Sequence, residues 1–312
     1  MIALTVRQSA APIVRRIGAM LLTLWFVLTL TFVLTFAIPT DPARAVAGPK
    51  ATQEQLETIR LSLRLDEPMA VQYVRYLASA AVLDLGYSHS QRRPVSDILL
   101  ERLPYTALLA VSAIMFQLIV GGALGLWAAV RSGGLFDKVV FVGALVVVAL
   151  PQFWVGLVLL FVFGFKLGWF PLGGASLPEG LVLPALTLGL AGVAWTSRIV
   201  RATASEALAS NIVLGLRGRG IAPRRIVLKH VVRLAAGPIL SVLALDLGLL
   251  LGGAVLVEAV FGWPGMGNTA FQALQQKDLP LIMGSVIVGS IFVLVINALL
   301  DTARVYLDPR TR

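Results

Sequence analysis

The charged side chains that could do chemistry in this chain gather between residues 198 and 233. The stretch is rich in Lys and Arg, and Glu206 is its single acid. It separates two apolar runs that are each long enough to cross a bilayer. One Arg at the centre of a membrane helix costs roughly 2.5 to 3.5 kcal/mol, so the whole stretch must lie in water. Short loops rich in Lys and Arg stay on the cytoplasmic side, and we therefore expect a cytoplasmic loop.

Part of this loop has the pattern of a short helix. Asn211 is placed to act as its N-cap, and Gly220 is placed to end it. Apolar residues between them precede Arg217 and Arg219. Two further glycines inside the helix cost about 1 kcal/mol each relative to Ala, so the helix is marginal until it meets a partner. A short helix held outside the membrane is typical of a docking element.

Three polar residues of the apolar spans are candidates for a translocation path. Asp246 is near the middle of the fifth span, where an unpaired carboxylate costs a few kcal/mol. It is expected to face the bundle interior, a partner subunit or a watery cavity, or to be protonated. Two interpretations stay open for Asp246: a residue of a translocation path, and a buried hydrogen-bonding group. Gln117 and Gln152 are likewise expected either to face a path or to bond between helices.

Motifs for catalysis and for cofactors are absent from the sequence. It has no G-x-x-x-x-G-K-[ST], so the chain does not bind ATP through a P-loop. With no Cys, two His and no H-E-x-x-H, it offers no credible metal site or cysteine active site. G-x-S-x-G is also absent, and Asp246 is the only acid deep within a span. We expect a non-catalytic chain whose energy supply enters from outside, through the basic loop.

Composition predicts an all-α polytopic membrane protein, because 58% of the 312 residues are hydrophobic and 13% are charged. If the N-terminus is cytoplasmic, most Lys and Arg lie in the segments on the cytoplasmic side of the membrane. The net charge of +10 is therefore interpreted as a sign of membrane topology rather than of nucleic-acid binding. The first apolar span is too long for a signal peptide and is expected to be retained. The six predicted spans are residues 17–38, 105–130, 139–165, 180–197, 234–257 and 279–300.

The first two spans are separated by a long segment, residues 39–103, which we expect to be a small helical extracytoplasmic insertion. Thr52 and Gln55 form a capping box at the start of one helix. Pro68 suits the first turn of another helix, and it leads into an apolar run of Val71, Val74, Leu77 and Ala81. The insertion is expected to be a structural collar on the helix tops, a receiver for a solute-binding protein, or both.

Glycine and proline shape the rest of the core. Gly121, Gly122 and Gly125 favour close helix packing in the second span, because membrane interfaces favour small residues. Pro151 is expected to kink the third helix. After Glu258, the sequence predicts an outer turn: Trp263 suits the membrane interface, and Pro264, Gly265 and Gly267 force the chain to reverse.

Strings along nearly the whole chain resemble one family, the permeases of bacterial ABC importers, in particular the dipeptide, oligopeptide and nickel branch. In the basic loop, the matching residues are Arg217, Gly220, Ile221, Arg225, His230, Arg233 and Pro238. Elsewhere, the matching strings include D-L-G-Y-S at 84–88, R-L-P-Y-T at 102–106, P-Q-F-W-V-G-L at 151–157 and E-A-V-F-G-W-P-G-M-G at 258–267. The chain departs from the family at Thr40, Arg64 and Leu83, where glycine is usual.

This resemblance implies half of a translocation pathway, completed by a second homologous permease subunit. It also implies two cytoplasmic ABC ATPase subunits that hold ATP and Mg, an extracytoplasmic solute-binding protein, and no cofactor or nucleic acid on this chain. The location implied is the bacterial inner membrane, with both termini cytoplasmic. The implied organisation is residues 1–38 with the first span, the insertion 39–103, the permease core 104–305 with its coupling loop 198–233, and the tail 306–312.

The resemblance also assigns residues to roles. Those expected to couple the chain to the ATPase are Asn211, Leu214, Leu216, Arg217, Arg219, Gly220, Ile221 and Arg225. Those expected at the translocation path or its gate are Gln117, Gln152, Asp246, Glu258, Phe261, Trp263, Pro264 and Gly265.

Alternatives remain for both the transported substrate and the class of membrane protein. Di- and oligopeptides are the expected cargo, and nickel or another small solute is the alternative within the family. A secondary transporter would show inverted repeats and more charge embedded in the membrane. A membrane-embedded enzyme would need a pair or triad of reactive groups within the spans, and the sequence shows none.

Overall fold

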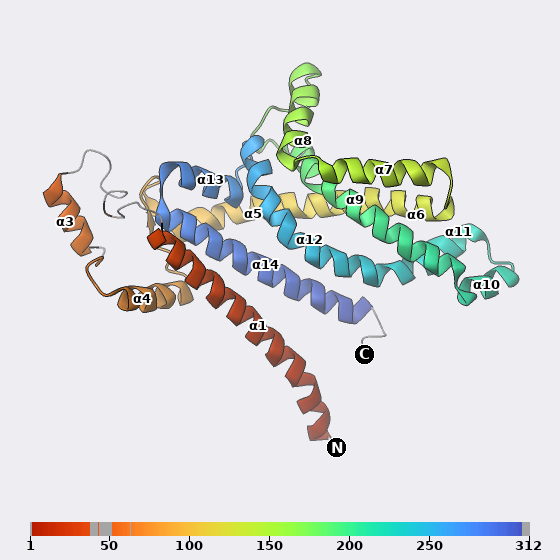
Figure 1. Cartoon of the computed structure of the whole chain (residues 1–312), viewed down its shortest axis with the longest axis horizontal. Helices are drawn as coiled ribbons and strands as arrows, with labels where there is room; N and C mark the ends of the chain where they lie inside the picture. The colour runs from red at the N-terminus through yellow and green to blue at the C-terminus, as the bar shows by residue number, and fades with distance from the viewer. Residues whose placement is uncertain (1, 38–42, 44–51, 63, 308–312) are drawn as a thin grey trace. The chain divides into compact units, whose positions relative to one another are not determined.

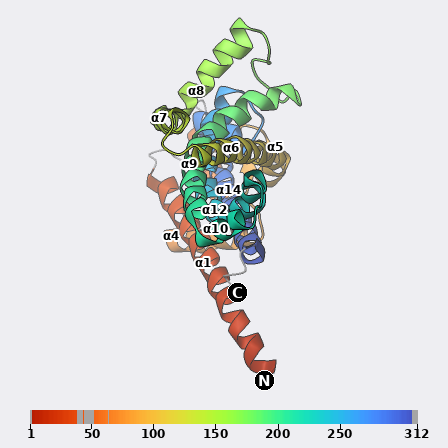
Figure 2. The same ribbon diagram turned by 90° about the vertical axis from the view of Figure 1, so that its right-hand side faces the viewer.

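The computed structural model describes residues 2–37, 43, 52–62 and 64–307, and leaves out some side chains within the helices of that part. Nearly all of the described chain is helical (Figures 1 and 2), as the composition predicts. The exception within it is a short antiparallel strand pair, β1 (Tyr87–Ser88) with β2 (Arg93–Pro94). The contacts divide the chain into two compact units: Met1–Leu103 with Thr269–Leu294, and Pro104–Asn268 with Val295–Arg312.

The helices follow one another along the chain with short connections. Those of the N-terminal part are α1 (Ile2–Ala37), α3 (Gln53–Ser62), α4 (Met69–Ala81) and α5 (Val95–Phe116). Next come the π-helix η1 (Gln117–Gly121), α6 (Gly122–Val130), α7 (Leu135–Ala149), α8 (Gln152–Leu159), the π-helix η2 (Leu160–Lys166) and α9 (Glu179–Ala209). The remainder are α10 (Asn211–Gly218), α11 (Pro223–Arg225), the π-helix η3 (Ile226–Val231), α12 (Val232–Val260), α13 (Met266–Gln276) and α14 (Leu279–Leu307).

Five of the six predicted spans lie in helices over their described residues, and the third is interrupted at Leu150 and Pro151. Among the described residues, four helical segments are long and apolar enough to cross a bilayer: Ile17–Leu34, Val95–Val130, Glu179–Ala209 and Leu279–Leu299. The bent pair α7 and α8 with η2 would make a fifth. The predicted fifth span, residues 234–257, lies within the 29 residues of α12.

Pro151 breaks the third span outright instead of kinking it. The two halves, Leu135–Ala149 and Gln152–Lys166, meet at 102°, and α8 turns sharply away from α7 in both views (Figures 1 and 2). Steric conflict with a proline ring drives the preceding residue out of the helical region. Leu150 is accordingly extended, with φ −84° and ψ 134°, and Pro151 is extended too.

Small residues allow the second span to pack closely on α9, the central helix of its unit. A Cβ placed on Gly121 would lie 3.0 Å from the carbonyl oxygen of Val193, and one on Gly125 would lie 2.5 Å from the carbonyl oxygen of Ser197. These contacts confirm the prediction for two of the three glycines. Gly122 has no such neighbour within 4 Å of its Cβ position among the described residues of this chain, so the contact with α9 does not involve it.

The helices of the insertion begin and end largely as predicted. The capping box is present: Gln55 N–H donates to Thr52 Oγ1 at 3.3 Å, and Thr52 N–H donates to Gln55 Oε1 at 3.0 Å. Arg64 and Leu83 follow α3 and α4 with φ of 53° and 58°. Left-handed turns therefore end both helices although the chain carries no glycine at either position. Thr40, the third departure from the family pattern, lies outside the described residues.

Asp278 fastens the strand pair to the start of α14. Its carboxylate accepts hydrogen bonds from Ser88 Oγ and Ser90 Oγ, both at 2.6 Å, and from Ser90 N–H at 2.9 Å. It also caps α14 by accepting from Leu281 N–H at 3.3 Å. Burial raises the pKa of this carboxyl, but the hydrogen bonds outweigh burial and hold the pKa below its ordinary value.

We predict that Gly125→Ala destabilises the protein by roughly 1 to 3 kcal/mol, because its Cβ would press on the backbone of α9. Thermal unfolding of the purified protein in detergent measures this loss. Gly122→Ala is the matched control, since the added methyl group meets nothing and alanine favours a helix. Equal unfolding temperatures for the two variants would contradict the packing shown here.

We also predict a loss of stability in acid that depends on Asp278. Because the folded pKa lies below the ordinary value, the stabilisation is present at neutral pH and is lost as pH falls through the folded pKa. Asp278→Asn should be less stable than the parent at neutral pH and should match it in acid. Proteolysis rates of the insertion across pH measure this difference. Asp66→Asn, on an exposed residue, should leave the pH profile unchanged.

Candidate functional site

The basic stretch is mostly helical, with only short breaks. The fourth predicted span ends at residue 197, but α9 continues to Ala209 because the chain beyond Arg201 is rich in good helix formers such as alanine. The stretch leaves helix at Ser210 and again over residues 219–222, between α10 and α11. The predicted loop is therefore a helical extension, a separate short helix and the approach to α12.

The short helix α10 begins one residue earlier than its predicted cap implies. Ser210, not Asn211, is the N-cap: its Oγ accepts from Val213 N–H at 3.4 Å, and its backbone is extended. Asn211 is the first helical residue and is exposed. Serine and asparagine are about equally good caps, so local propensity did not distinguish the two positions.

The end of α10 is a Schellman turn built on Gly220. Ile221 N–H donates to Leu216 O at 3.2 Å, and Gly220 N–H donates to Arg217 O at 2.9 Å. Gly220 has φ +72°, a conformation that glycine adopts without cost. The predicted helix end is confirmed, and the required glycine conformation explains why the turn sits there.

One face of α10 packs on neighbouring helices, and the opposite face is exposed. Val213 is fully buried in a cluster with residues of α6, α9 and η3, and Leu216 and Ile221 pack against it. Ile212 and Leu214 are more than half exposed. The remaining predicted coupling residues, Arg217, Arg219 and Arg225, are also exposed. Among the described residues, these three arginines have no ion-pair partner.

A buried carboxylate organises the predicted outer turn. Glu258, near the end of α12, has no exposed surface. It accepts from Thr106 Oγ1 at 2.8 Å and from Asn268 N–H, in the first turn of α13, at 2.9 Å. Thr106 in turn accepts from Met266 N–H at 2.8 Å. Glu258 thus caps the N-terminus of α13 by accepting a backbone hydrogen bond, and Thr106 joins α5 to both.

Glycine makes room for this carboxylate. A Cβ on Gly265 would collide with Glu258 Oε1, and one on Gly267 would lie 2.9 Å from Glu258 Oε2. The spacing of glutamate and glycines in the E-A-V-F-G-W-P-G-M-G string therefore has a physical cause. Thr106 belongs to the R-L-P-Y-T string, but the sequence alone predicts no role for it, because its hydrogen-bond partners are 152 and 160 residues away.

Trp263 lies in the core, so its predicted place at the membrane interface is wrong. It has no exposed surface, and its Nε1–H donates to Tyr105 O at 3.1 Å. Phe261 is also buried, and its carbonyl accepts from Gly174 N–H at 3.1 Å. Pro264 is half-buried. Tryptophan favours the membrane interface because its indole N–H needs a hydrogen-bond partner, and here Tyr105 O provides that partner inside the protein.

Gln117 and Gln152 both make the interhelical hydrogen bonds that were the alternative to a path role. Gln117 is fully buried and donates to Thr196 Oγ1 of α9 at 2.9 Å. Gln152 donates to Leu188 O of α9 at 3.0 Å. Asp246 lies within α12, and its side chain is outside the described part of the structure.

An ion pair between α7 and α9 was not predicted from the sequence. Asp137 is almost fully buried and accepts from both the Nε and a terminal nitrogen of Arg201, the latter at 2.6 Å. Gly133 N–H donates to the same carboxylate at 2.9 Å. The partners are 64 residues apart, so no local pattern connects them. Within the described residues, no group of three or more metal-ligating side chains is gathered.

We predict that Thr106→Val lowers the stability of the permease core by about 1 to 3 kcal/mol, because it leaves Met266 N–H and Glu258 short of a buried partner. Thermal unfolding in lipid measures the change. Thr106→Ser keeps the hydroxyl and should stay close to the parent. If valine is tolerated as well as serine, Thr106 does not hold the outer turn together.

Two family models cover most of the chain. Residues 121–312 match the model described as the inner membrane component of binding-protein-dependent transport systems. Residues 11–110 match the N-terminal model for membrane components of such systems.

Relatives that match over nearly their full length are also permease proteins of transport systems. The glutathione transport system permease protein GsiC of Escherichia coli O6:H1 is 34% identical over 300 residues, which are 96% of this chain and 98% of the relative. GsiC of Shigella dysenteriae serotype 1 is 33% identical over the same shares. A solved structure of the MetNI methionine ABC transporter, in inward-facing conformations, aligns with a TM-score of 0.57 at 18% identity. It covers 68% of this chain and 96% of the solved one, and it supports the fold alone.

Subunits of this family are not enzymes and bind no cofactor, because a partner ATPase hydrolyses the ATP. They are multi-pass proteins of the inner membrane. The chain belongs to the family of inner membrane components of binding-protein-dependent transport systems, and it is the permease subunit of an ABC importer.

Proposed function

We propose that this permease imports di- or oligopeptides delivered by an extracytoplasmic solute-binding protein. It forms half of the translocation pathway, and a second homologous permease subunit forms the other half. Two ATPase subunits drive it from the cytoplasm through α10. The observation that carries the coupling proposal is the two-sided character of α10, anchored by Val213 and exposing Ile212, Leu214 and Arg217.

The anchoring of α10 suits it to transmit force. Its buried face shares one cluster with Ala129 of α6, Ala204 and Ala207 of α9, and Ile226 and Val231 of η3. A push on the exposed face therefore reaches α9 directly, and reaches α12 through η3. A rigid element with two arrangements is the physical basis that such coupling needs.

Charge supports the orientation. Lys and Arg of the turn at 131–138, of the stretch 198–233 and of both chain ends fall on one side when six spans alternate, which favours cytoplasmic termini. On the opposite side lies the turn held by Glu258 and Thr106. We infer that this turn is part of the outer gate, with Phe261, Trp263, Pro264 and Gly265 forming its rigid body.

The peptide cargo rests on likeness to the glutathione transport system permease protein GsiC. Glutathione is a short peptide with carboxylates and an amine, so a path for it needs polar side chains that the substrate can meet in passing. We propose Asp246 and Gln152 for this role, and Gln117, which is fully buried and bonded to Thr196, for its immediate support.

We predict that Gly220→Val uncouples transport from ATP hydrolysis. A β-branched residue at φ +72° is strained by roughly 1 to 2 kcal/mol, which opens the Schellman turn and loosens α10. The complete complex in proteoliposomes should keep most of its ATPase activity and lose peptide uptake. Gly218→Ala is the matched control, because Gly218 is helical and its Cβ would meet nothing. Normal uptake by Gly220→Val would count against the coupling role of this turn.

The substrate is tested by ATPase activity of the complex in lipid. Binding protein loaded with glutathione or a dipeptide should stimulate hydrolysis above the level with empty binding protein. Nickel-loaded binding protein is the comparison within the family. Stimulation by nickel and not by peptide would overturn the peptide assignment while leaving the importer itself intact.

A further inference from the structure

Helix α4 belongs to the segment predicted to lie outside the membrane, yet its contacts run along two membrane spans. Its inner face packs on α1: Tyr73 Oη lies 2.7 Å from Thr29 Oγ1, and its ring meets Phe32 edge-on at 5.2 Å between centroids. Further along, Ala80 is buried in a cluster with Leu28 of α1 and Ile287 of α14.

The depth of these contacts follows from helix geometry. Leu28 lies six residues inside the apolar window of α1, which ends at Leu34, so it is about 9 Å below that end. Ile287 lies eight residues after Leu279, where the apolar part of α14 begins, so it is about 12 Å below. The contacts with α1 and with α14 thus place Ala80 at similar depths, and both depths fall within the roughly 30 Å thickness of the hydrocarbon.

After α4, the chain returns along α14 toward the N-terminal end of that helix. Leu85 lies 3.5 Å from the Cβ position of Gly284, and the Cβ position of Gly86 lies 3.8 Å from Cβ of Pro280. Ser88 finally reaches Asp278, just before α14 begins. The contacts step steadily from Ile287 to Asp278, so α4 is deeper than the strand pair that follows it.

The outer face of α4 is apolar. Val71, Val74, Ala78 and Val82 follow a helical spacing and are all exposed, Val74 by 65%. The charged residue of α4 that borders this stripe is Arg75, which is paired with Glu67. The predicted apolar run of Val71, Val74, Leu77 and Ala81 is divided in the structure. Leu77 packs against the cluster of Leu28, Ala80 and Ile287, whereas Val71 and Val74 are exposed.

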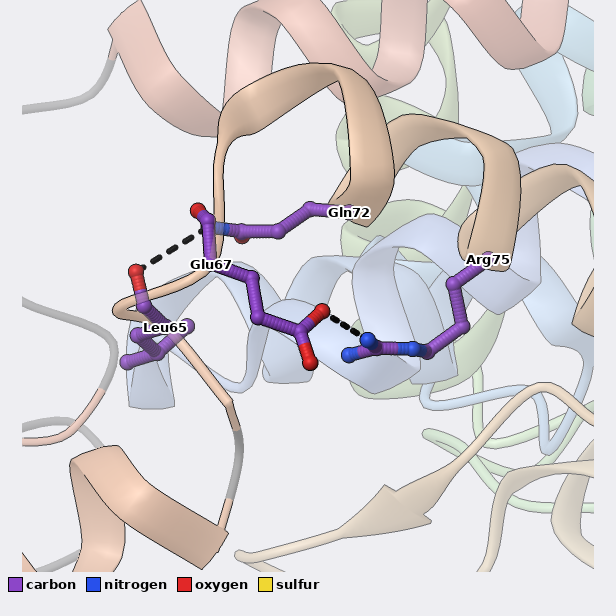
Figure 3. Close-up of polar contacts among 4 residues, drawn as sticks. All are labelled: Leu65, Glu67, Gln72 and Arg75. Atoms are coloured by element: carbon purple, nitrogen blue, oxygen red, sulfur yellow. Dashed lines mark hydrogen bonds and ion pairs between the residues drawn. The ribbon is translucent and has the colours of Figure 1, made fainter.

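The polar groups at the start of α4 satisfy one another (Figure 3). Arg75 is paired with Glu67, and Gln72 Nε2–H donates to Leu65 O at 3.0 Å and to Glu67 O at 2.8 Å. An apolar surrounding requires such internal partners for backbone carbonyls and charges. The pair lies in the first half of α4, near Tyr73, whose contacts with Thr29 and Phe32 of α1 are closer to the apolar boundary at Leu34 than Leu28 is.

We propose that α4 is a re-entrant helix that dips into the leaflet nearest the insertion, with lipid acyl chains covering Val71, Val74, Ala78 and Val82. Beyond its contact with α4, the same face of α1 exposes Trp25 and Leu21, which follow Leu28 at helical spacing within the membrane span. The contact with α4 therefore adjoins a lipid-facing surface. Naming this the outer leaflet rests on the orientation proposed above, whereas contact with lipid does not.

The natural absence of cysteine makes the proposal directly testable. Val74→Cys, labelled with bimane in the complete transporter in proteoliposomes, should lose fluorescence to brominated phosphatidylcholine as strongly as Phe26→Cys on α1. Iodide in the buffer should quench it far less than it quenches Glu57→Cys on the exposed part of α3. Bromine near the headgroup should quench more than bromine near the chain end.

Two results would overturn the proposal. Quenching by iodide to the level of Glu57→Cys would place α4 in water, above the membrane. Resistance to both quenchers would mean that a protein partner covers the stripe. Ala78→Cys, a smaller change on the same stripe, repeats the test independently of any packing fault at Val74.

Discussion

The hydrocarbon of the bilayer sets the constraint on which this structure depends: every polar group within a span must find its partner inside the protein. Helix α9 supplies many of those partners. Gln117 bonds to its Thr196, Gln152 bonds to its Leu188 carbonyl, and Asp137 pairs with its Arg201. The same need explains why Glu258, with no exposed surface, gathers Thr106 and the backbone of α13 around it.

Close packing turns those bonds into a rigid frame. Gly121 and Gly125 bring the second span against α9, and the break at Pro151 sends α8 away from α7 so that Gln152 can reach α9. The cluster around Val213 extends the frame to α10. A subunit that holds no ATP can respond to its partner's hydrolysis only through such a stiff connection, because a loose loop would absorb the movement.

Much of this was predictable because it is local. Hydrophobic length predicts the six spans, and the glycine at 220 predicts the end of α10 through its freedom at positive φ. Long-range pairing was not predictable. The Asp137–Arg201 pair, the partners of Thr106 and the burial of Trp263 depend on residues far away in sequence. The cap of α10 was placed one residue late because Ser210 and Asn211 are equally good caps.

The most direct test of the account is site-specific cross-linking from the exposed face of α10. Leu214→Cys, carrying a short photoreactive label, should cross-link to the ATPase subunit in the assembled transporter. The same label at Trp169→Cys, an exposed residue of the loop before α9, should not. Cross-linking at Leu214 that changes when ATP is added would support α10 as the contact that transmits movement. An active transporter with no cross-link at Leu214 would contradict the central claim.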